Sequence, residues 1–311
     1  MNSLIISTSS FDTGNNPAIQ RLLQQGFQVI TNPHKRKLTE GEIIELLAHG
    51  ATGLIAGIEP LTERVFQSAP HLKVISRCGA GLDSVDLAAA KHHGITVLNT
   101  PEAPAQAVAE LTLGLMLTLL RQINPIDRAV RNGEWPRTQG RLLAAQTVGI
   151  IGLGYIGRRV ARLCQAFEAT VIAHDPFATQ ISDGVTLMPL EQLLASADII
   201  TLHTPYSADT HHMLNAQAFA AMKPEAIVVN AARGGLVDEN ALLAALQSGK
   251  ISAALDVFEQ EPYHGPLIES GNVILTSHVG SLARESRQRM EIEAAENLLQ
   301  GLIESGLVNN G

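Results

Sequence analysis

Apolar segments that fit buried strands alternate with amphipathic segments that fit helices along the whole chain. In the first third, the expected strands are residues 3–8, 28–31, 53–56, 73–77 and 96–99. The expected helices of this part are residues 17–25, 39–48 and 106–122. Regular alternation of strands and helices predicts parallel sheets that are covered by helices. The chain is therefore expected to be an α/β protein.

The alternation continues after an irregular stretch that contains Trp135 and Pro136. Expected strands follow at residues 148–151, 169–173, 199–202, 226–230, 253–256 and 273–276. A helix is expected at residues 158–167, and a last helix from Ala283 onward. The second part of the chain thus has the same class of pattern as the first.

Residues 147–176 contain the most specific motif, a strand followed by three glycines, a helix and a second strand. Gly152 permits a tight turn, Gly154 lets a pyrophosphate approach the backbone, and Gly157 lets the helix pack closely on the sheet. The phosphates would lie at the helix N-terminus, where unpaired N–H groups favour anions. Asp175 ends the second strand and can accept hydrogen bonds from an adenosine ribose. This unit predicts a Rossmann domain that binds NAD.

The motif begins about 145 residues into a chain of 311 residues, which is long enough for two domains. We therefore expect a cofactor domain inserted into a discontinuous substrate domain, with the C-terminal helix returning to the first part. The expected boundaries are 1–99 with 284–311 for the substrate domain and 100–283 for the NAD-binding domain.

Composition excludes several classes of function. A net charge of −8 argues against a nucleic-acid partner, and an aromatic content of 4% leaves few side chains for base stacking. Cys78 and Cys164 are too few for a disulfide framework, and no metal site is expected. No signal peptide is apparent, and the apolar run at 111–120 is too short to span a bilayer. We expect a cytoplasmic protein without a membrane partner.

Arg233 follows the strand expected at 226–230 and precedes Gly234 and Gly235. The carboxyl end of a strand in an open α/β sheet faces the crevice where ligands bind. A guanidinium there can bind a carboxylate through two parallel hydrogen bonds. A surface arginine that caps a helix is the alternative, since Asp238 is expected to start a helix nearby.

His278 follows the last expected strand, and Glu261 lies beyond the strand before it. Oxidation of an alcohol by hydride transfer must also remove the hydroxyl proton. A histidine is the natural base for this step, and a carboxylate can orient it and stabilise its charged form. Glu261 and His278 could form such a pair, although each could also be a solvated loop residue.

Residues 228–281 and 72–117 resemble the signature segments of the D-isomer-specific 2-hydroxyacid dehydrogenases, in particular the D-3-phosphoglycerate dehydrogenase branch. The resemblance implies that a flavodoxin-like substrate domain carries the inserted Rossmann domain. It implies that Arg233 binds the substrate carboxylate, that His278 exchanges the proton and that Glu261 supports His278. It also implies a homodimer in which the segment around Trp135 reaches toward the partner.

The same resemblance implies the binding residues. Cofactor contacts are expected from Gly152, Gly154, Tyr155, Ile156, Gly157, Asp175, His203, Thr204, Pro205, Ala231, Ala232, Arg233, Asp256, His278, Gly280 and Ser281. Substrate contacts are expected from Arg77, Gly79, Ala80, Gly81 and Arg233, with the backbone around Gly79 forming an amide-lined concavity for a carboxylate.

The chain departs from the phosphoglycerate branch in one informative place. Gly57 stands where that branch usually has an arginine that helps to hold the substrate phosphate, while Arg77 remains as a second pocket arginine. The sequence also ends at residue 311, so the C-terminal regulatory domain of longer relatives is not expected.

The leading hypothesis is an NAD-dependent enzyme that interconverts a small D-2-hydroxy acid and its 2-keto acid. Because of Gly57, an unphosphorylated keto acid is a serious candidate substrate. Glyoxylate or hydroxypyruvate reductase and a phosphite-oxidising relative are alternatives with the same catalytic residues. An NAD-sensing corepressor is an alternative from another class, and a methyltransferase would not explain the Arg, Glu and His series.

Overall fold

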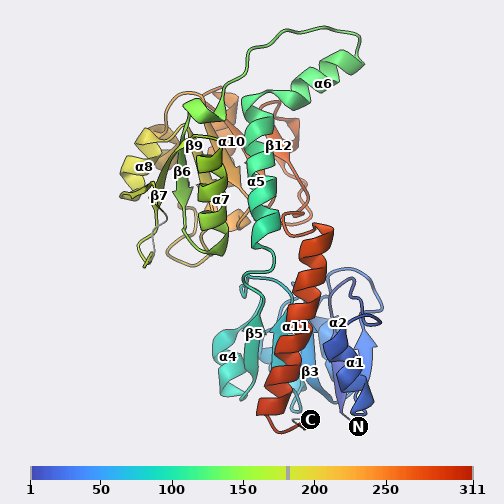
Figure 1. The fold of residues 1–311 in the computed structure, drawn as a ribbon. Coiled ribbons are helices and arrows are strands. Elements are labelled where there is room, and N and C mark those ends of the chain that lie inside the picture. Colours follow the sequence, from blue (N-terminus) through green and yellow to red (C-terminus); the bar gives the residue numbers. More distant parts are fainter. Residues whose placement is uncertain (1, 180–182, 310–311) are drawn as a thin grey trace. The chain divides into compact units, whose positions relative to one another are not determined.

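The computed structural model describes residues 2–179 and 183–309, which form two compact units (Figure 1). The first unit comprises Met1–Pro104 and Leu282–Gly311, and the second comprises Ala105–Ser281. These divisions lie within five residues of the boundaries expected from the sequence. Each unit contains one parallel sheet, which confirms the predicted fold class.

The first unit is built on a five-stranded sheet with the order β2-β1-β3-β4-β5. This is the flavodoxin-like strand order. Its strands are β1 (Ser3–Ile6), β2 (Gln28–Thr31), β3 (Ala51–Ala56), β4 (Val74–Arg77) and β5 (Thr96–Asn99). Its helices are α1 (Pro17–Gln24), α2 (Glu40–Leu47), α3 (Glu63–Ser68), α4 (Leu87–His92) and α11 (Arg284–Glu304).

The C-terminal helix α11 runs along the sheet of the first unit (Figure 1). A Cβ atom at Gly53 would lie 2.8 Å from Leu4 and 3.0 Å from Leu298. The missing side chain therefore lets α11 approach β3 closely. β1 and β3 are buried along their whole length, as expected for parallel strands covered on both faces.

The second unit is built on a seven-stranded parallel sheet with the order β12-β11-β10-β9-β6-β7-β8. If β6 is counted as the first strand, the strands β6 to β11 have the Rossmann order, and β12 is one further strand at the edge. Its strands are β6 (Thr147–Ile151), β7 (Thr170–His174), β8 (Val185–Leu187), β9 (Ile199–Leu202), β10 (Ala226–Asn230), β11 (Ile251–Leu255) and β12 (Val273–Leu275). Its α-helices are α5 (Ala105–Leu120), α6 (Ile123–Arg131), α7 (Tyr155–Ala166), α8 (Leu190–Ser196), α9 (Ala216–Ala221) and α10 (Glu239–Gln247). Its 3-10 turns are η1 (Leu143–Ala145), η2 (Gly234–Leu236) and η3 (Pro266–Glu269).

The structure adds the strand β8 and helices α3, α4, α6, α8 and α9 to the elements expected from the sequence. Two differences, at α7 and α6, have physical causes. Helix α7 begins at Tyr155, three residues before the predicted start, because Gly154 already serves as its N-cap. Helix α6, which was not predicted as a separate element, has no buried residue and projects from the second unit with the loop after it (Figure 1). Across the described ranges, every helix is too short or too polar to cross a membrane.

Candidate active site

The glycine turn after β6 has the geometry that a bound dinucleotide requires. Gly152 has φ of +95°, and a Cβ atom there would lie 2.6 Å from the carbonyl oxygen of His203. A Cβ atom at Gly157 would lie 1.9 Å from the carbonyl oxygen of Gly152. Any side chain at either position would therefore push the turn apart. The turn needs both glycines.

Gly154 differs from Gly152 and Gly157, because a Cβ atom at Gly154 would meet nothing within 4 Å. Gly154 is the N-cap of α7, and its cap has no side-chain hydrogen bond. The open space and the N–H groups of the first helical turn together fit a pyrophosphate. Tyr155 and Ile156 form the start of that turn, and the guanidinium of Arg158 lies 5.6 Å from the centre of the Tyr155 ring.

Asp175 lies directly after β7, which pairs in parallel with β6. Its Oδ2 atom accepts a hydrogen bond of 2.7 Å from the N–H of Leu153, and its Oδ1 atom accepts one of 2.8 Å from Phe177. The carboxylate is thereby held against the glycine turn, where an adenosine ribose would lie in a Rossmann domain. Together with Gly154, this arrangement fits NAD.

His203, Thr204 and Pro205 follow β9 on the other side of the turn. Burial lowers the pKa of His203 to about 3, so the imidazole is neutral at physiological pH. Its Nε2 atom lies 2.9 Å from Oγ1 of Thr201, and its Nδ1 atom is buried without a hydrogen-bond partner among the described residues. The contact of its carbonyl oxygen with Gly152 places this residue beside the cofactor turn.

Arg233, Glu261 and His278 lie on loops that leave three adjacent strands. Arg233 follows β10, Glu261 follows β11, and His278 follows β12, and these strands are neighbours in the sheet. Because the strands are parallel, their carboxyl ends share one edge. The structure thus brings the three predicted catalytic residues of the second unit to one edge of its sheet.

The imidazole of His278 pairs with the carboxylate of Glu261 at 2.8 Å between Nδ1 and Oε2. The N–H of Phe258 donates to the other oxygen of Glu261 at 3.1 Å. About a third of each side chain is exposed, 39% for His278 and 33% for Glu261. A pair that is held on one side and open on the other is suited to proton transfer.

Asp256 holds the loop that carries His278. One carboxylate oxygen accepts hydrogen bonds from the N–H of Val279 at 2.9 Å and from the hydroxyl of Thr276 at 2.6 Å. The other oxygen accepts from the N–H of Gly280 at 2.8 Å, and the backbone carbonyl of Asp256 accepts from the N–H of His278. This buried side chain was predicted as a cofactor contact, and its observed bonds indicate that it positions His278. Ser281 follows Gly280 and is the last residue of the second unit.

Arg233 is positioned by its neighbours on β10. The side chain of Asn230 donates to the carbonyl of Arg233 at 2.8 Å and accepts from the N–H of Ala232 at 3.0 Å. A Cβ atom at Gly234 would lie 1.9 Å from the carbonyl carbon of Phe258. The Ala231–Gly234 loop therefore packs directly against the loop that carries Glu261.

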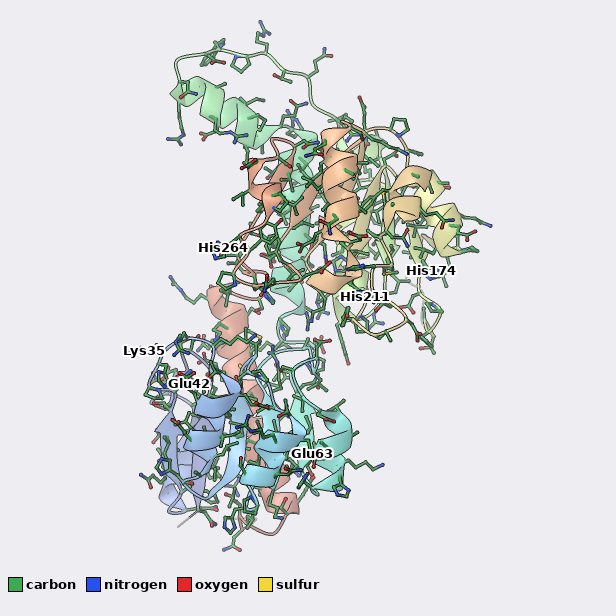
Figure 2. All side chains as sticks on the ribbon, turned by 180° about the vertical axis from the view of Figure 1, so that it is seen from behind. Lys35, Glu42, Glu63, His174, His211 and His264 are labelled. Atoms are coloured by element: carbon green, nitrogen blue, oxygen red, sulfur yellow. The ribbon has the colours of Figure 1, made fainter. Side chains whose placement is uncertain are left out.

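Sequence reasoning missed a cluster of polar residues formed by Glu239, Glu259 and His212. The carboxylate of Glu239, at the start of α10, accepts from the N–H of Glu259 at 2.8 Å. The carboxylate of Glu259 in turn lies 2.8 Å from Nε2 of His212. Burial raises the pKa of Glu239. The neighbouring His211, labelled in Figure 2, pairs with Tyr206. No local pattern in the sequence connects these residues, since His212 and Glu259 are 47 positions apart.

The predicted substrate residues of the first unit lie at the end of β4, whose last residue is Arg77, and in the loop after it. The N–H of Gly79 donates to Oγ1 of Thr100 at 2.8 Å, so the carboxylate-binding prediction depends on the backbone of Ala80 and Gly81. The carbonyl of Ala80 accepts from Asn99 at 2.7 Å. The guanidinium of Arg77 donates to the carbonyl of Cys78 and lies over Gly79, which has φ of +141°. A Cβ atom at Gly79 would overlap that guanidinium.

Among the described residues, no group of three or more His, Cys, Asp or Glu side chains has the geometry of a metal site. The two cysteines are buried, and burial raises the pKa of the Cys78 thiol to about 11 and that of Cys164 to about 12. Neither thiol is prepared for nucleophilic chemistry.

Comparison with known proteins identifies the family. Residues 113–280, more than half of the chain, match the model of the D-isomer specific 2-hydroxyacid dehydrogenase, NAD binding domain. The chain is 40% identical over 283 residues to D-3-phosphoglycerate dehydrogenase of Methanocaldococcus jannaschii, which covers 88% of this chain and 54% of that protein. It thus spans about half the length of the curated phosphoglycerate dehydrogenases that it matches.

Two further relatives match over nearly their full length. Hydroxypyruvate reductase of Thermotoga maritima is 36% identical over 292 residues, which cover 92% of this chain and 94% of that protein. The crystal structure of a glyoxylate reductase from Paecilomyes thermophila aligns with a TM-score of 0.88 and 30% identity, covering 98% of this chain and 96% of the other. The chain belongs to the D-isomer-specific 2-hydroxyacid dehydrogenase family, and residues 113–280 correspond to its NAD-binding domain.

Proposed function

We propose that this protein is an NAD-dependent dehydrogenase that interconverts a D-2-hydroxy acid and its 2-keto acid. The observation that carries the proposal is the edge where Arg233, Glu261 and His278 leave adjacent strands, with His278 and Glu261 paired at 2.8 Å. Bound NAD would accept or donate the hydride. The remaining work, which the protein must do itself, is to bind the acid and to move one proton.

Each of the three residues has a separate role in this proposal. Arg233 binds the substrate carboxylate through its planar guanidinium and polarises the carbonyl at C2. His278 takes the hydroxyl proton during oxidation and returns it during reduction. Glu261 fixes the ring through Nδ1, which leaves Nε2 to face the substrate, and it stabilises the charged imidazolium.

The test is consumption of NADH by the purified protein with a panel of 2-keto acids. We propose an unphosphorylated substrate, because Gly57 replaces an arginine and because the relatives matched over nearly their full length are named hydroxypyruvate and glyoxylate reductases. Turnover of hydroxypyruvate or glyoxylate supports this choice. A strong preference for phosphohydroxypyruvate contradicts it.

Each unit would bind the ligand that the sequence predicts for it. The second unit would bind NAD through Gly152–Gly157, Asp175 and the predicted contacts after β9 to β12. The first unit would contribute the substrate contacts of Arg77 and Gly79–Gly81. Chimeric exchange of residues 105–281 with those of an NADP-dependent relative tests this, because cofactor preference should follow the exchanged unit.

We also propose a homodimer formed by the projecting segment. In α6 and the loop after it, Trp135 is 82% exposed, and Ile123 and Leu142 are 50% and 67% exposed. Large apolar side chains that project in this way are typical of an interface. Light scattering should give twice the 33.2 kDa chain mass for the wild type and a lower mass for Trp135→Glu. The cytoplasmic location stays a prediction from composition.

A further inference from the structure

Glu59 is a buried carboxylate at the carboxyl edge of the first unit's sheet. The residue is only 1% exposed. Its Oε1 atom accepts hydrogen bonds from the hydroxyl of Ser7 and from the N–H of Gly57, the latter at 3.1 Å. Ser7 follows β1 and Gly57 follows β3, so the carboxylate ties two neighbouring loops together.

Glu59 differs from Glu291, the other buried glutamate of this unit. The carboxylate of Glu291 pairs with the guanidinium of Arg287 at 2.7 Å. Within residues 2–179 and 183–309, no lysine, arginine or histidine lies at ion-pair distance from Glu59. Burial of a carboxylate without a cation is unfavourable. The position of Glu59 therefore calls for an explanation beyond packing.

The loop that contains Glu59 runs beside the predicted substrate loop. Ala56 pairs with Arg77 in the sheet, and the N–H of Cys78 donates to the carbonyl of Ala56 at 2.9 Å. Adjacent strands lie about 4.8 Å apart. The residues that follow Ala56 therefore leave the sheet next to those that follow Arg77, at the edge where α/β sheets bind ligands.

This part of the edge has an exposed apolar side chain next in sequence to the buried acid. Ile58 is 42% exposed, although it is a large apolar residue. A Cβ atom at Gly57 would lie 2.9 Å from Oε2 of Glu59 and 3.5 Å from Cα of Thr8. A side chain at position 57 would therefore require the carboxylate end of Glu59 to shift from its observed place.

We propose that Glu59 is a specificity-determining residue that rejects substrates with an anionic group at the end distal to the reacting carboxylate. Its charge repels a phosphate or a second carboxylate, and protein surroundings with little water strengthen that repulsion. Ile58 contacts a short uncharged substituent instead. The inference depends on the proposed dehydrogenase function and narrows its substrate to 2-hydroxy acids with an uncharged distal end.

The experiment compares reduction of hydroxypyruvate with reduction of phosphohydroxypyruvate and oxaloacetate, each with NADH. Glu59→Gln keeps an oxygen that can accept from Ser7 and Gly57 but removes the charge. We expect the kcat/KM for the two anionic keto acids to rise about tenfold relative to that for hydroxypyruvate, which is a difference of about 1.4 kcal/mol. Glu63→Gln is the matched control, because Glu63 is a half-buried glutamate on α3 of the same unit whose carboxylate pairs with His93 (Figure 2). The control should leave the ratio unchanged.

A second variant decides the matter if Glu59→Gln does not fold. Ile58→Lys changes an exposed side chain and adds a cation at the same edge, so it should also raise the relative kcat/KM for anionic keto acids. Unchanged ratios in every folded variant would overturn the role of Glu59 and Ile58 while the dehydrogenase function stands. An equal shift in Glu63→Gln, or a wild type that prefers phosphohydroxypyruvate, would also overturn it. A wild type that reduces none of these acids would refute the dehydrogenase function and this inference together.

Discussion

Nδ1 of His278 lies 2.8 Å from Oε2 of Glu261, and backbone hydrogen bonds hold both residues. The N–H of His278 donates to the carbonyl of Asp256 at 2.8 Å, and the N–H of Phe258 donates to Glu261. His278 has φ of +56°, an uncommon conformation for a residue other than glycine. Uncommon backbone conformations of this kind concentrate at functional sites, where the surrounding structure maintains them.

Glu261→Gln should lower the turnover of alcohol oxidation. The Glu261 carboxylate holds the His278 ring through Nδ1 and offsets the charge that the ring gains when it takes the hydroxyl proton. A neutral amide can keep a hydrogen bond but not the charge, so kcat should fall by about tenfold or more while the affinity for NADH is unchanged. Steady-state kinetics with saturating NAD measure kcat for the wild type and the variant. Equal turnover of the two proteins would show that Glu261 does not support the proton-transfer residue.

Arg233→Lys should lose most activity although the charge is preserved. One ammonium group cannot provide the two parallel hydrogen bonds that a guanidinium gives to a carboxylate. Loss of a charge-assisted hydrogen bond costs about 1.5–3 kcal/mol, so kcat/KM should fall by at least about tenfold. Both kcat and KM should change if Arg233 also polarises the carbonyl. A lysine variant with wild-type kinetics would place Arg233 away from the substrate.

The protein should bind NAD more tightly than NADP. The Asp175 carboxylate would repel a 2′-phosphate, and no lysine or arginine occurs in the sequence between Arg162 and Lys223. Asp175→Asn keeps an oxygen for the N–H of Leu153 and removes the charge, so the preference for NAD should fall about tenfold or more. Fluorescence titrations with NADH and NADPH measure the ratio. Tighter binding of NADPH by the wild type would contradict the assignment of Asp175.

His203 should make the folded protein sensitive to acid. Burial lowers its pKa from an ordinary 6.5 to about 3, so the unfolded chain binds a proton at this residue below pH 6.5 while the folded chain does not. Stability is therefore lost as the pH falls from 6.5 toward 3. Between pH 6.5 and pH 5 the loss from this residue is about 2 kcal/mol.

His203→Gln removes this titration and can keep a hydrogen bond to Thr201. Urea unfolding of both proteins at pH 7 and pH 5 should show that the variant loses about 2 kcal/mol less over this interval. Equal losses in the two proteins would mean that His203 titrates alike in the folded and unfolded chains.

The dinucleotide unit could be predicted from sequence because its signals are local. The strand, the glycines and Asp175 occur within thirty residues, and each glycine has one steric requirement. The error was at the start of α7, where Gly157 was taken as preceding the helix. In the structure Gly157 lies within the first turn, and its missing side chain permits contact with the carbonyl of Gly152.

Other features depend on contacts between distant residues and left no local signal. The burial of Glu59 depends on Ser7, 52 positions earlier in the chain. The hydrogen bond from the N–H of Glu259 to Glu239 joins the loop after β11 to the start of α10. Helix α6 buries none of its residues, so no hydrophobic pattern marked its bounds in the sequence. The sequence shows that Gly57 stands in place of an arginine. It does not show that the buried carboxylate of Glu59 accepts a hydrogen bond from the N–H of Gly57.

The most direct test of the account compares NADH consumption by the wild type and by His278→Ala, with hydroxypyruvate and glyoxylate as substrates. The wild type should reduce at least one of them to the hydroxy acid, which for hydroxypyruvate is the D-enantiomer. His278→Ala should be slower by about two to four orders of magnitude, since it lacks the proton-transfer group, while its affinity for NADH is unchanged. A wild type without turnover on any 2-keto acid, or a variant with near-normal turnover, would contradict the account.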